Sequence, residues 1–263
     1  MAKILAGRSA VITGSTSGIG QAIARAYAAE GANIMLNGFG DAAAIESLRA
    51  GLAKEHGVKV QFHGADMSKP AEIRDLIAKA EAAFGAVDIL VNNAGIQHVA
   101  PIQDFPEDRW DAIIAINLSS AFHATKAALP GMMKRRWGRI INIASAHGLV
   151  ASPNKSAYVS AKHGIIGFTK ATAVETAEHG IRANAICPGF VHTPLVQKQI
   201  EDRAREAGVS QDKAARDIIL APQPTKEFVT VEQIAATALF LVGPGADQTT
   251  GASFSIDGGW TAR

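Results

Sequence analysis

A glycine-rich loop near the start of the chain does most to restrict the fold. Residues 13–20 read T-G-S-T-S-G-I-G, and they separate a short apolar run at 9–13 from an alanine-rich stretch that continues to about residue 30. A strand, a glycine loop and a helix in this order expose backbone amides at the start of the helix, where the pyrophosphate of a dinucleotide binds. We therefore expect a cofactor site that includes Gly14, Thr16, Ser17, Gly18, Ile19 and Gly20.

The rest of the chain repeats the alternation of short apolar runs and helical stretches. Such alternation predicts a parallel sheet covered by helices on both faces. The expected fold is a single-domain, Rossmann-like, doubly wound α/β sheet of seven parallel strands, and 263 residues suit one such domain. The strands are expected near residues 9–13, 33–37, 58–63, 87–91, 139–144, 181–187 and 252–259. Residues 194–226 differ from the rest because they are charged and end in Pro222-Gln223-Pro224.

The composition excludes several classes of function. Lys and Arg number 26 and Asp and Glu 24, a net charge of +2 that gives no indication of a nucleic-acid or membrane partner. A basic cluster at 134–139 is typical of a solvated helix end. The single cysteine, Cys187, fits a reducing compartment and has no neighbouring metal ligands, so we expect no catalytic metal. The first eight residues lack an apolar signal core, and we expect a cytoplasmic protein.

Three residues near the middle of the chain suggest acid–base chemistry. Ser145 ends an apolar strand, and Tyr158 and Lys162 stand four residues apart in the next helix. Side chains at this spacing share one helix face, which can also be an ordinary amphipathic pair. A nearby ammonium lowers the pKa of a phenol from about 10, so we expect Lys162 to make Tyr158 a usable base. Ser145 can donate a hydrogen bond to a substrate oxygen.

This serine, the Tyr-x-x-x-Lys motif thirteen residues later and the spacing of the glycine loop resemble the short-chain dehydrogenase/reductase family over nearly the whole chain. The resemblance implies that Asn117 is a fourth catalytic residue beside Ser145, Tyr158 and Lys162, holding a water that links Lys162 to solvent; Asn117 could also simply bond a neighbouring backbone. It makes residues 194–226 a helical lid over the substrate. It implies further cofactor contacts from Asp66, Met67, Asn93, Ala94, Gly95, Tyr158, Lys162, Pro188, Gly189, Val191 and Thr193.

The segment after the second strand indicates which cofactor binds. A ribose 2′-phosphate needs an arginine or lysine, whereas a free 2′-hydroxyl is usually met by an acid. Residues 17 and 37–40 contain no cation, and Phe39 offers an apolar wall, so NAD is expected rather than NADP. No acid ends the strand, and Asp41 is better explained as the cap of the next helix. For Asp66, a contact with the adenine and a role together with Ser68 in capping the helix at Pro70 remain equally good.

Four polar residues are expected to converge where the substrate binds, namely Gln97, His147, Lys155 and Gln199. One cation with three hydrogen-bonding neighbours suits a small carboxylate. With Trp260, this set resembles members of the family that oxidise D-3-hydroxybutyrate to acetoacetate. The resemblance implies a small hydroxy acid or keto acid as substrate, held against Ser145 and Tyr158, and a homotetramer.

Two other functions are consistent with parts of the pattern. An NADPH-dependent 3-oxoacyl thioester reductase would share the catalytic residues, but it predicts a cation near residue 17 or residues 38–39. A nucleotide-sensing binding protein without turnover predicts the loss of the serine, the tyrosine or the lysine, and all three are present.

Overall fold

The computed structural model describes residues 3–192 and 194–262, and these form a seven-stranded parallel sheet in the order β3-β2-β1-β4-β5-β6-β7. This confirms the predicted doubly wound fold. Most of the strands are apolar and fully buried, which is expected where helices cover both faces. The strands are β1 (Ser9–Ile12), β2 (Asn33–Asn37), β3 (Val60–His63), β4 (Ile89–Asn92), β5 (Gly138–Ile143), β6 (Ile181–Pro188) and β7 (Ser253–Ile256).

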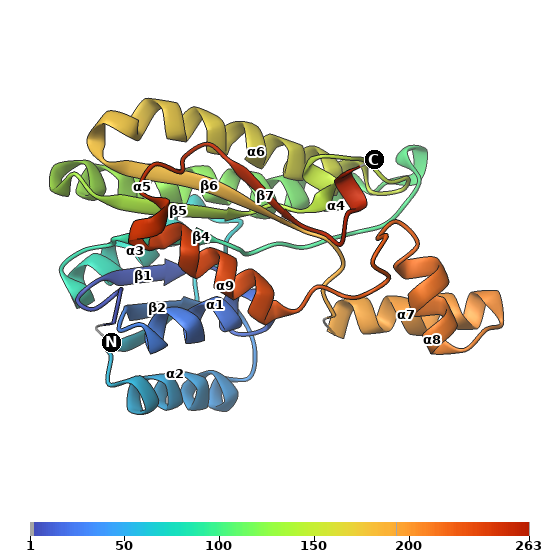
Figure 1. The fold of residues 1–263 in the computed structure, drawn as a ribbon, viewed down its shortest axis with the longest axis horizontal. Helices are drawn as coiled ribbons and strands as arrows, with labels where there is room; N and C mark the ends of the chain where they lie inside the picture. The colour runs from blue at the N-terminus through green and yellow to red at the C-terminus, as the bar shows by residue number, and fades with distance from the viewer. Residues whose placement is uncertain (1–2, 193, 263) are drawn as a thin grey trace.

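The helices lie in two layers on either side of the sheet (Figure 1). Helices α1, α2 and α9 share one hydrophobic core with one face of the sheet, and α3, α5 and α6 pack on the other face. The helices are α1 (Gly18–Ala29), α2 (Ala42–His56), α3 (Pro70–Phe84), α4 (Glu107–Ile114), α5 (Ser120–Arg135), α6 (Ser156–Thr176), α7 (Pro194–Ala207), α8 (Gln211–Ala214) and α9 (Val231–Val242).

The strand order reverses at β1, which pairs with β2 on one side and β4 on the other. The chain segments that leave β1 and β4 therefore run to opposite faces of the sheet and open a crevice at the carboxyl ends of the strands. Ligands of doubly wound proteins bind at this position, so the topology alone places a site there.

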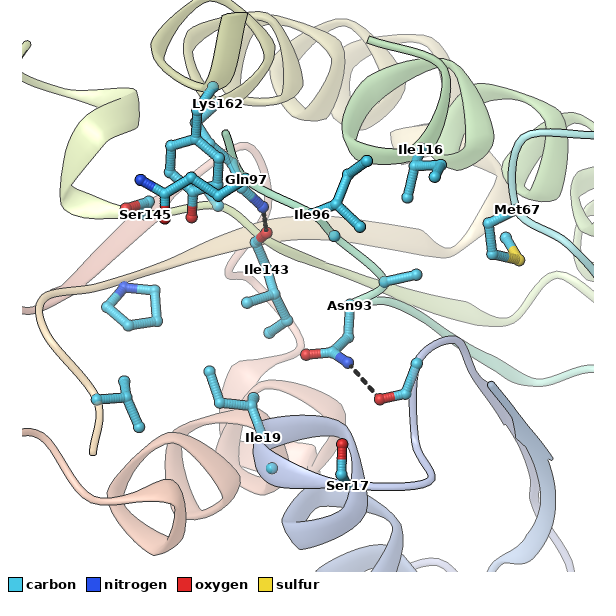
Figure 2. A pocket seen from close by; sticks show the side chains of 18 of the residues that line it. Ser17, Ile19, Met67, Asn93, Ile96, Gln97, Ile116, Ile143, Ser145 and Lys162 are labelled. Carbon is cyan, nitrogen blue, oxygen red and sulfur yellow. Dashed lines mark hydrogen bonds between the residues drawn. The ribbon is translucent and has the colours of Figure 1, made fainter. Parts of the chain in front are cut away.

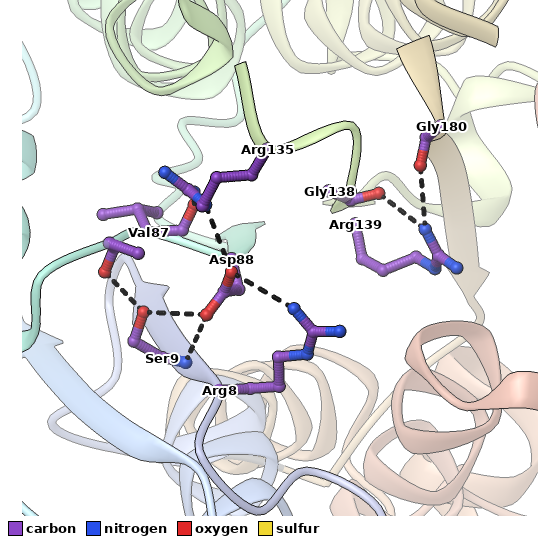
Figure 3. A network of polar contacts seen from close by, with 9 residues as sticks. Arg8, Ser9, Val87, Asp88, Arg135, Gly138, Arg139 and Gly180 are labelled. Carbon is purple, nitrogen blue, oxygen red and sulfur yellow. Dashed lines mark hydrogen bonds and ion pairs between the residues drawn. The ribbon is translucent and has the colours of Figure 1, made fainter. Parts of the chain in front are cut away.

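A network of charged side chains lies at the opposite, amino-terminal ends of the strands (Figure 3). The Asp88 carboxylate, almost fully buried before β4, accepts a hydrogen bond from the Ser9 amide at 3.0 Å. Arg8 and Arg135 approach the same carboxylate within 3.5 and 3.6 Å. Because a buried charge is costly unless it is paired, this network fixes the amino-terminal ends of β1 and β4 and leaves the carboxyl ends for function.

The expected long helix after β4 is a continuous helical stretch with an irregular middle. Helices α4 and α5 are joined by the π-helical turn Ala115–Ser119, which contains Asn117. By length and composition the stretch Glu107–Arg135 could cross a membrane. It packs, however, against α3, α6 and β4, as a core helix of an α/β domain does.

Helices α7 and α8 occupy the segment expected to differ and project beyond the ends of the strands (Figure 1). Both ends of this segment are tied together. The fully buried Gln223 amide accepts a hydrogen bond from the Phe190 amide and donates one to the Glu227 carbonyl at 2.7 Å. Val191 and Val229 form an isolated parallel bridge beside it. The boundaries of the expected strands are off by up to three residues, since the third starts at Val60 and the seventh ends at Ile256.

Two glycine substitutions test the close packing of α1 on the glycine loop. A Cβ on Gly20 would clash with the Gly14 carbonyl and come within 2.5 Å of the Asn93 amide nitrogen. Gly20→Ala is therefore expected to lower the free energy of unfolding by about 1–3 kcal/mol, as overpacking does. Gly51→Ala in α2 meets no atom within 4 Å and is expected to raise it by about 0.5–1 kcal/mol. Urea unfolding of both variants measures this, and equal effects would contradict the packing argument.

Candidate active site

A cavity of about 500 Å³ lies at the carboxyl ends of the strands and brings together most of the predicted site residues. Figure 2 shows part of it, with the glycine loop on one side and Lys162 and Gln97 on the other. The predicted residues in its wall are Gly14, Thr16, Ser17, Gly18, Ile19, Phe39, Asp66, Met67, Asn93, Ala94, Gly95, Gln97, Ser145, His147, Lys155, Tyr158, Lys162, Pro188, Gly189, Val191, Gln199 and Trp260. Asn117 and Gly20 lie behind the wall, and Thr193 falls outside the described residues.

The glycine loop offers an uncapped helix end to the cavity. Gly14 and Gly18 have φ angles of 62° and 55°, which glycine adopts without strain. Helix α1 begins at Gly18, Ser17 makes no side-chain cap, and the first turn has no acid. The first amides of α1 are therefore free for an anion, and the helix dipole favours one.

Asn93 fixes the loop after β4 to the glycine loop. Its amide nitrogen donates to the carbonyls of Thr13 and Gly14, both at 2.9 Å, as Figure 2 shows in part. The Thr13 hydroxyl in turn accepts from the Asn93 and Ala94 amides at 3.0 Å. The backbone around the middle of the cavity is thus held by side chains from its own wall.

Among the described residues, none of those that line the end of the cavity beside β2 is a cation. Phe39 is 69% exposed, and its carbonyl accepts a hydrogen bond from the Thr16 hydroxyl at 2.9 Å. Asp41 caps α2 through the Ala44 amide at 2.8 Å, which confirms its expected structural role. Asn37, which the sequence analysis did not assign to the site, is fully buried at the end of β2 and bonds Gly14 and the chain after β3.

Asp66 has structural partners as well as a place in the cavity wall. Its carboxylate accepts hydrogen bonds from the Ser68 amide at 2.8 Å and the Ser68 hydroxyl at 2.7 Å. These bonds, rather than Lys69 nearby, mainly hold the pKa of Asp66 below its usual value. Lys69, not Asp66 or Ser68, stands at the cap position of α3 and makes no side-chain cap, so the expected helix-capping role is wrong. A ligand contact for Asp66 stays a prediction.

Ser145, Tyr158 and Lys162 meet at the centre of the cavity. Tyr158 is hydrogen-bonded to Ser145, which acts to lower the pKa of the phenol, but burial has the larger effect and raises it. The Lys162 ammonium donates to the Ile143 carbonyl at 2.7 Å, and burial lowers its pKa to about 8 (Figure 2). The expectation that Lys162 brings the phenol into the basic range is therefore wrong for the ligand-free protein, in which desolvation dominates.

Asn117 supports the cavity from behind. Its side chain accepts from the Ile96 amide at 2.8 Å and donates to the Ile96 carbonyl at 2.9 Å. Both polar ends of this buried amide are thereby used by the loop after β4, which is the simpler of the two roles expected for it. The π-helical turn places it there, and such turns are frequent at functional sites.

The far end of the cavity combines polar groups with an aromatic wall. Phe190 and Trp260 stack with their planes 7° apart, and the Lys155 ammonium lies 5.6 Å from the centre of the Phe190 ring. Burial lowers the pKa of Lys155. The Gln97 amide nitrogen is buried with no hydrogen-bond partner in the described part of the protein. Phe190 was missed by the sequence analysis because nothing in its neighbourhood along the chain marks it as facing Trp260.

His147 is buried among aromatic rings at the same end. It meets Tyr158 and Trp260 edge to face, at 5.9 and 4.8 Å between ring centres. Burial, with Lys155 as a smaller contributor, lowers the pKa of His147 to about 4. The imidazole is therefore neutral at physiological pH. No group of three or more His, Cys, Asp and Glu side chains able to hold a metal occurs in the ranges that the structure describes.

The glycine loop lies where the strand order of the doubly wound sheet reverses, and its free amides can bind an anion. It shares the cavity with Ser145, Tyr158 and Lys162. Together these features define a nucleotide-dependent oxidoreductase. The chain belongs to the short chain dehydrogenase family, whose sequence profile matches residues 8–204. It is 60% identical to the D-beta-hydroxybutyrate dehydrogenase of Cupriavidus necator, over 99% of this chain and 100% of the relative. It is 57% identical to the enzyme of the same name from Rhizobium meliloti, over 97% and 99% of the two chains. A 3-oxoacyl-(acyl-carrier-protein) reductase from Thermotoga maritima is 35% identical over 97% of this chain and 98% of its own.

The low pKa of His147 predicts an acid-sensitive contribution to stability. Between its folded pKa of about 4 and its unfolded pKa of about 6.5, the unfolded chain binds more protons, so stability falls as the pH falls through this range. At pH 5 this lowers the free energy of unfolding by about 2 kcal/mol relative to pH 7. His147→Gln removes the titration and should show a smaller loss in urea unfolding at the two pH values. An equal loss in both proteins would contradict the prediction.

Proposed function

We propose that this protein catalyses the reversible, NAD-dependent oxidation of D-3-hydroxybutyrate to acetoacetate. The observation that carries the proposal is the polar end of the cavity. The half-buried ammonium of Lys155 lines the same cavity as the Gln97 amide, whose nitrogen has no hydrogen-bond partner in the described part of the protein. A small carboxylate would give both groups a partner. The names of the relatives at 60% and 57% identity support the same substrate.

The cavity wall suits a dinucleotide without a 2′-phosphate. The uncapped start of α1 would receive the pyrophosphate, and the surface around Phe39, where the described wall has no cation, would face the adenosine ribose. When bound, an oxidised nicotinamide supplies the acceptor for a hydride and a positive charge near the phenol. We assign further contacts with it to Asn93–Gly95, Pro188, Gly189 and Val191, and to Asp66 and Met67 at the adenine end.

The chain's own groups would handle the proton. Lys155, Gln97, His147 and Gln199 hold the carboxylate, which places the substrate hydroxyl between Ser145 and Tyr158. Ser145 donates to the substrate oxygen, and Tyr158 takes its proton. Tyr158 must be a phenolate before it takes this proton, and the ammonium of Lys162 would favour that form, which burial opposes. In the reverse direction the raised pKa keeps Tyr158 protonated, so that a proton is available for the substrate oxygen.

A reductase for 3-oxoacyl thioesters is less well supported. Its thioester carries no free carboxylate, so it would leave Lys155 without a counter-charge, and NADPH would find no cation beside Phe39 among the described residues of the wall. A binding protein without turnover is also less well supported, because the wall retains all three groups at its centre.

We also propose that the enzyme is located in the cytoplasm. A single buried thiol, Cys187, fits the reducing cytoplasm. We also propose a homotetramer. Apolar side chains on α5 and α6 remain exposed, with Phe122 at 45% and Val174 at 82%, and further copies of the chain would cover such a face.

Removing the phenol hydroxyl tests the base directly. Tyr158→Phe is expected to lower kcat for D-3-hydroxybutyrate with NAD by about 10²–10⁴-fold, the range for a lost general base. The dissociation constant for NAD should stay within about twofold. Absorbance of the reduced cofactor and titration of bound NAD measure the two quantities, with NADP and a 3-oxoacyl thioester as comparison substrates. Near-normal turnover by the variant would exclude Tyr158 as the base, and preference for NADP with the thioester would favour the reductase.

Removing the half-buried ammonium of Lys155 tests the carboxylate site. Lys155→Ala loses a charge-assisted hydrogen bond of about 1.5–3 kcal/mol and is expected to raise KM for D-3-hydroxybutyrate roughly 10–100-fold. The KM for NAD should hardly change, because Lys155 lies over the Phe190 ring and is not among the predicted cofactor contacts. Lys170→Ala, which removes an exposed ammonium from α6, is the matched control. Equal steady-state constants for Lys155→Ala and the control would remove Lys155 from the site.

A further inference from the structure

One hydrogen bond of His147 leads out of the cavity to a residue with no assigned role. The Nε2 atom lies 2.9 Å from the Ser152 hydroxyl oxygen in the loop before α6. No described residue bonds Nδ1, so Nδ1 is the polar atom of the ring that is free for a ligand. Ser152 has no other hydrogen-bond partner in the ranges that the structure covers, so its hydroxyl is free to orient toward the ring.

Because the imidazole is neutral, one of its nitrogens carries a proton and the other accepts a hydrogen bond. If Nε2 carried the proton, Nδ1 would turn a lone pair toward a carboxylate, which is itself an acceptor. If Ser152 donates to Nε2, the proton lies on Nδ1 and the free edge of the ring becomes a donor. The Ser152 hydroxyl can take part in either arrangement, since it can donate or accept, and an anion beside Lys155 favours the second.

We infer that Ser152 is a positioning residue that fixes the Nδ1–H tautomer of His147 and so makes the buried ring a hydrogen-bond donor to the substrate carboxylate. The edge-to-face contacts with Tyr158 and Trp260 hold the ring in place, which prevents a flip from exchanging the two nitrogens. The ring then contributes a donor without contributing a charge, and Lys155 remains the cation of the site. The choice of tautomer and its consequence for the substrate both rest on the function proposed above, but the tautomer itself can be measured without any substrate.

The tautomer is measured on the ligand-free protein labelled with ¹⁵N in its histidines, with His147→Gln used to assign the signal. In the wild type, Nδ1 should show the protonated shift and coupling, and Nε2 the shift of an acceptor. In Ser152→Ala, protonation should move toward Nε2, the form favoured in free histidine. Protonated Nε2 in the wild type would overturn the inference whatever the enzyme acts on.

Kinetics test the consequence for the substrate. Ser152→Ala should raise KM for D-3-hydroxybutyrate about fivefold, the effect of one neutral hydrogen bond, with kcat and the KM for NAD within about twofold. Ser152→Thr keeps the hydroxyl and should restore both the tautomer and KM. Ser156→Ala is the matched control, because it removes a buried hydroxyl four residues further along the chain that has no hydrogen-bond partner among the residues that the structure describes.

The outcomes separate this inference from the proposed function. An altered tautomer in Ser152→Ala with an unchanged KM would show that His147 does not donate to the substrate. A raised KM that Ser152→Thr fails to restore would indicate a disturbed loop and also contradict the inference. Absence of turnover of D-3-hydroxybutyrate by the wild type would refute the proposed function, and the ¹⁵N measurement would still decide the tautomer.

Discussion

The rest of the structure depends on how β1 is paired. It lies parallel to both β2 and β4, and the chain reaches these two neighbours in opposite directions. Since β2 lies on one side and β4 on the other, the loops after β1 and β4 must part, and nothing in the sheet fills the space between them. The buried Asp88 network secures the far ends of the same two strands. Binding groups can therefore lie at the carboxyl ends of the strands, while the contacts at the amino ends maintain the register between β1 and β4.

Burial sets the chemistry of the site more strongly than any single charge does. It raises the pKa of Tyr158, lowers that of Lys162 to about 8 and lowers that of His147 to about 4. All three shifts favour the neutral form, as expected when water is excluded. Charges brought by a ligand would shift these values in opposite ways, since an anion near Lys155 would raise the pKa of His147 and a cation near Tyr158 would lower that of the phenol.

Much of this could be predicted from the sequence, because the informative residues act locally. The glycine loop, the alternation of strands and helices, and the spacing of Tyr158 and Lys162 are properties of short segments, and the structure places them in one cavity. The cap by Asp41 was predicted for the same reason. What the sequence could not provide are contacts between distant segments, such as Phe190 on Trp260 or Asn37 on the loop after β3. The predicted direction of the pKa shift of Tyr158 was wrong, because the spacing of residues along a helix does not reveal how much water a side chain loses on folding.

The amide of Gln223 has a mechanical consequence. It joins the chain just before α7 to the chain just after the segment that contains α8, and the bridge between Val191 and Val229 doubles the connection. The two stalks of this projection therefore cannot slide past each other without exposing a fully desolvated side chain. Any movement of this projection would therefore carry α7 and α8 together as one rigid unit.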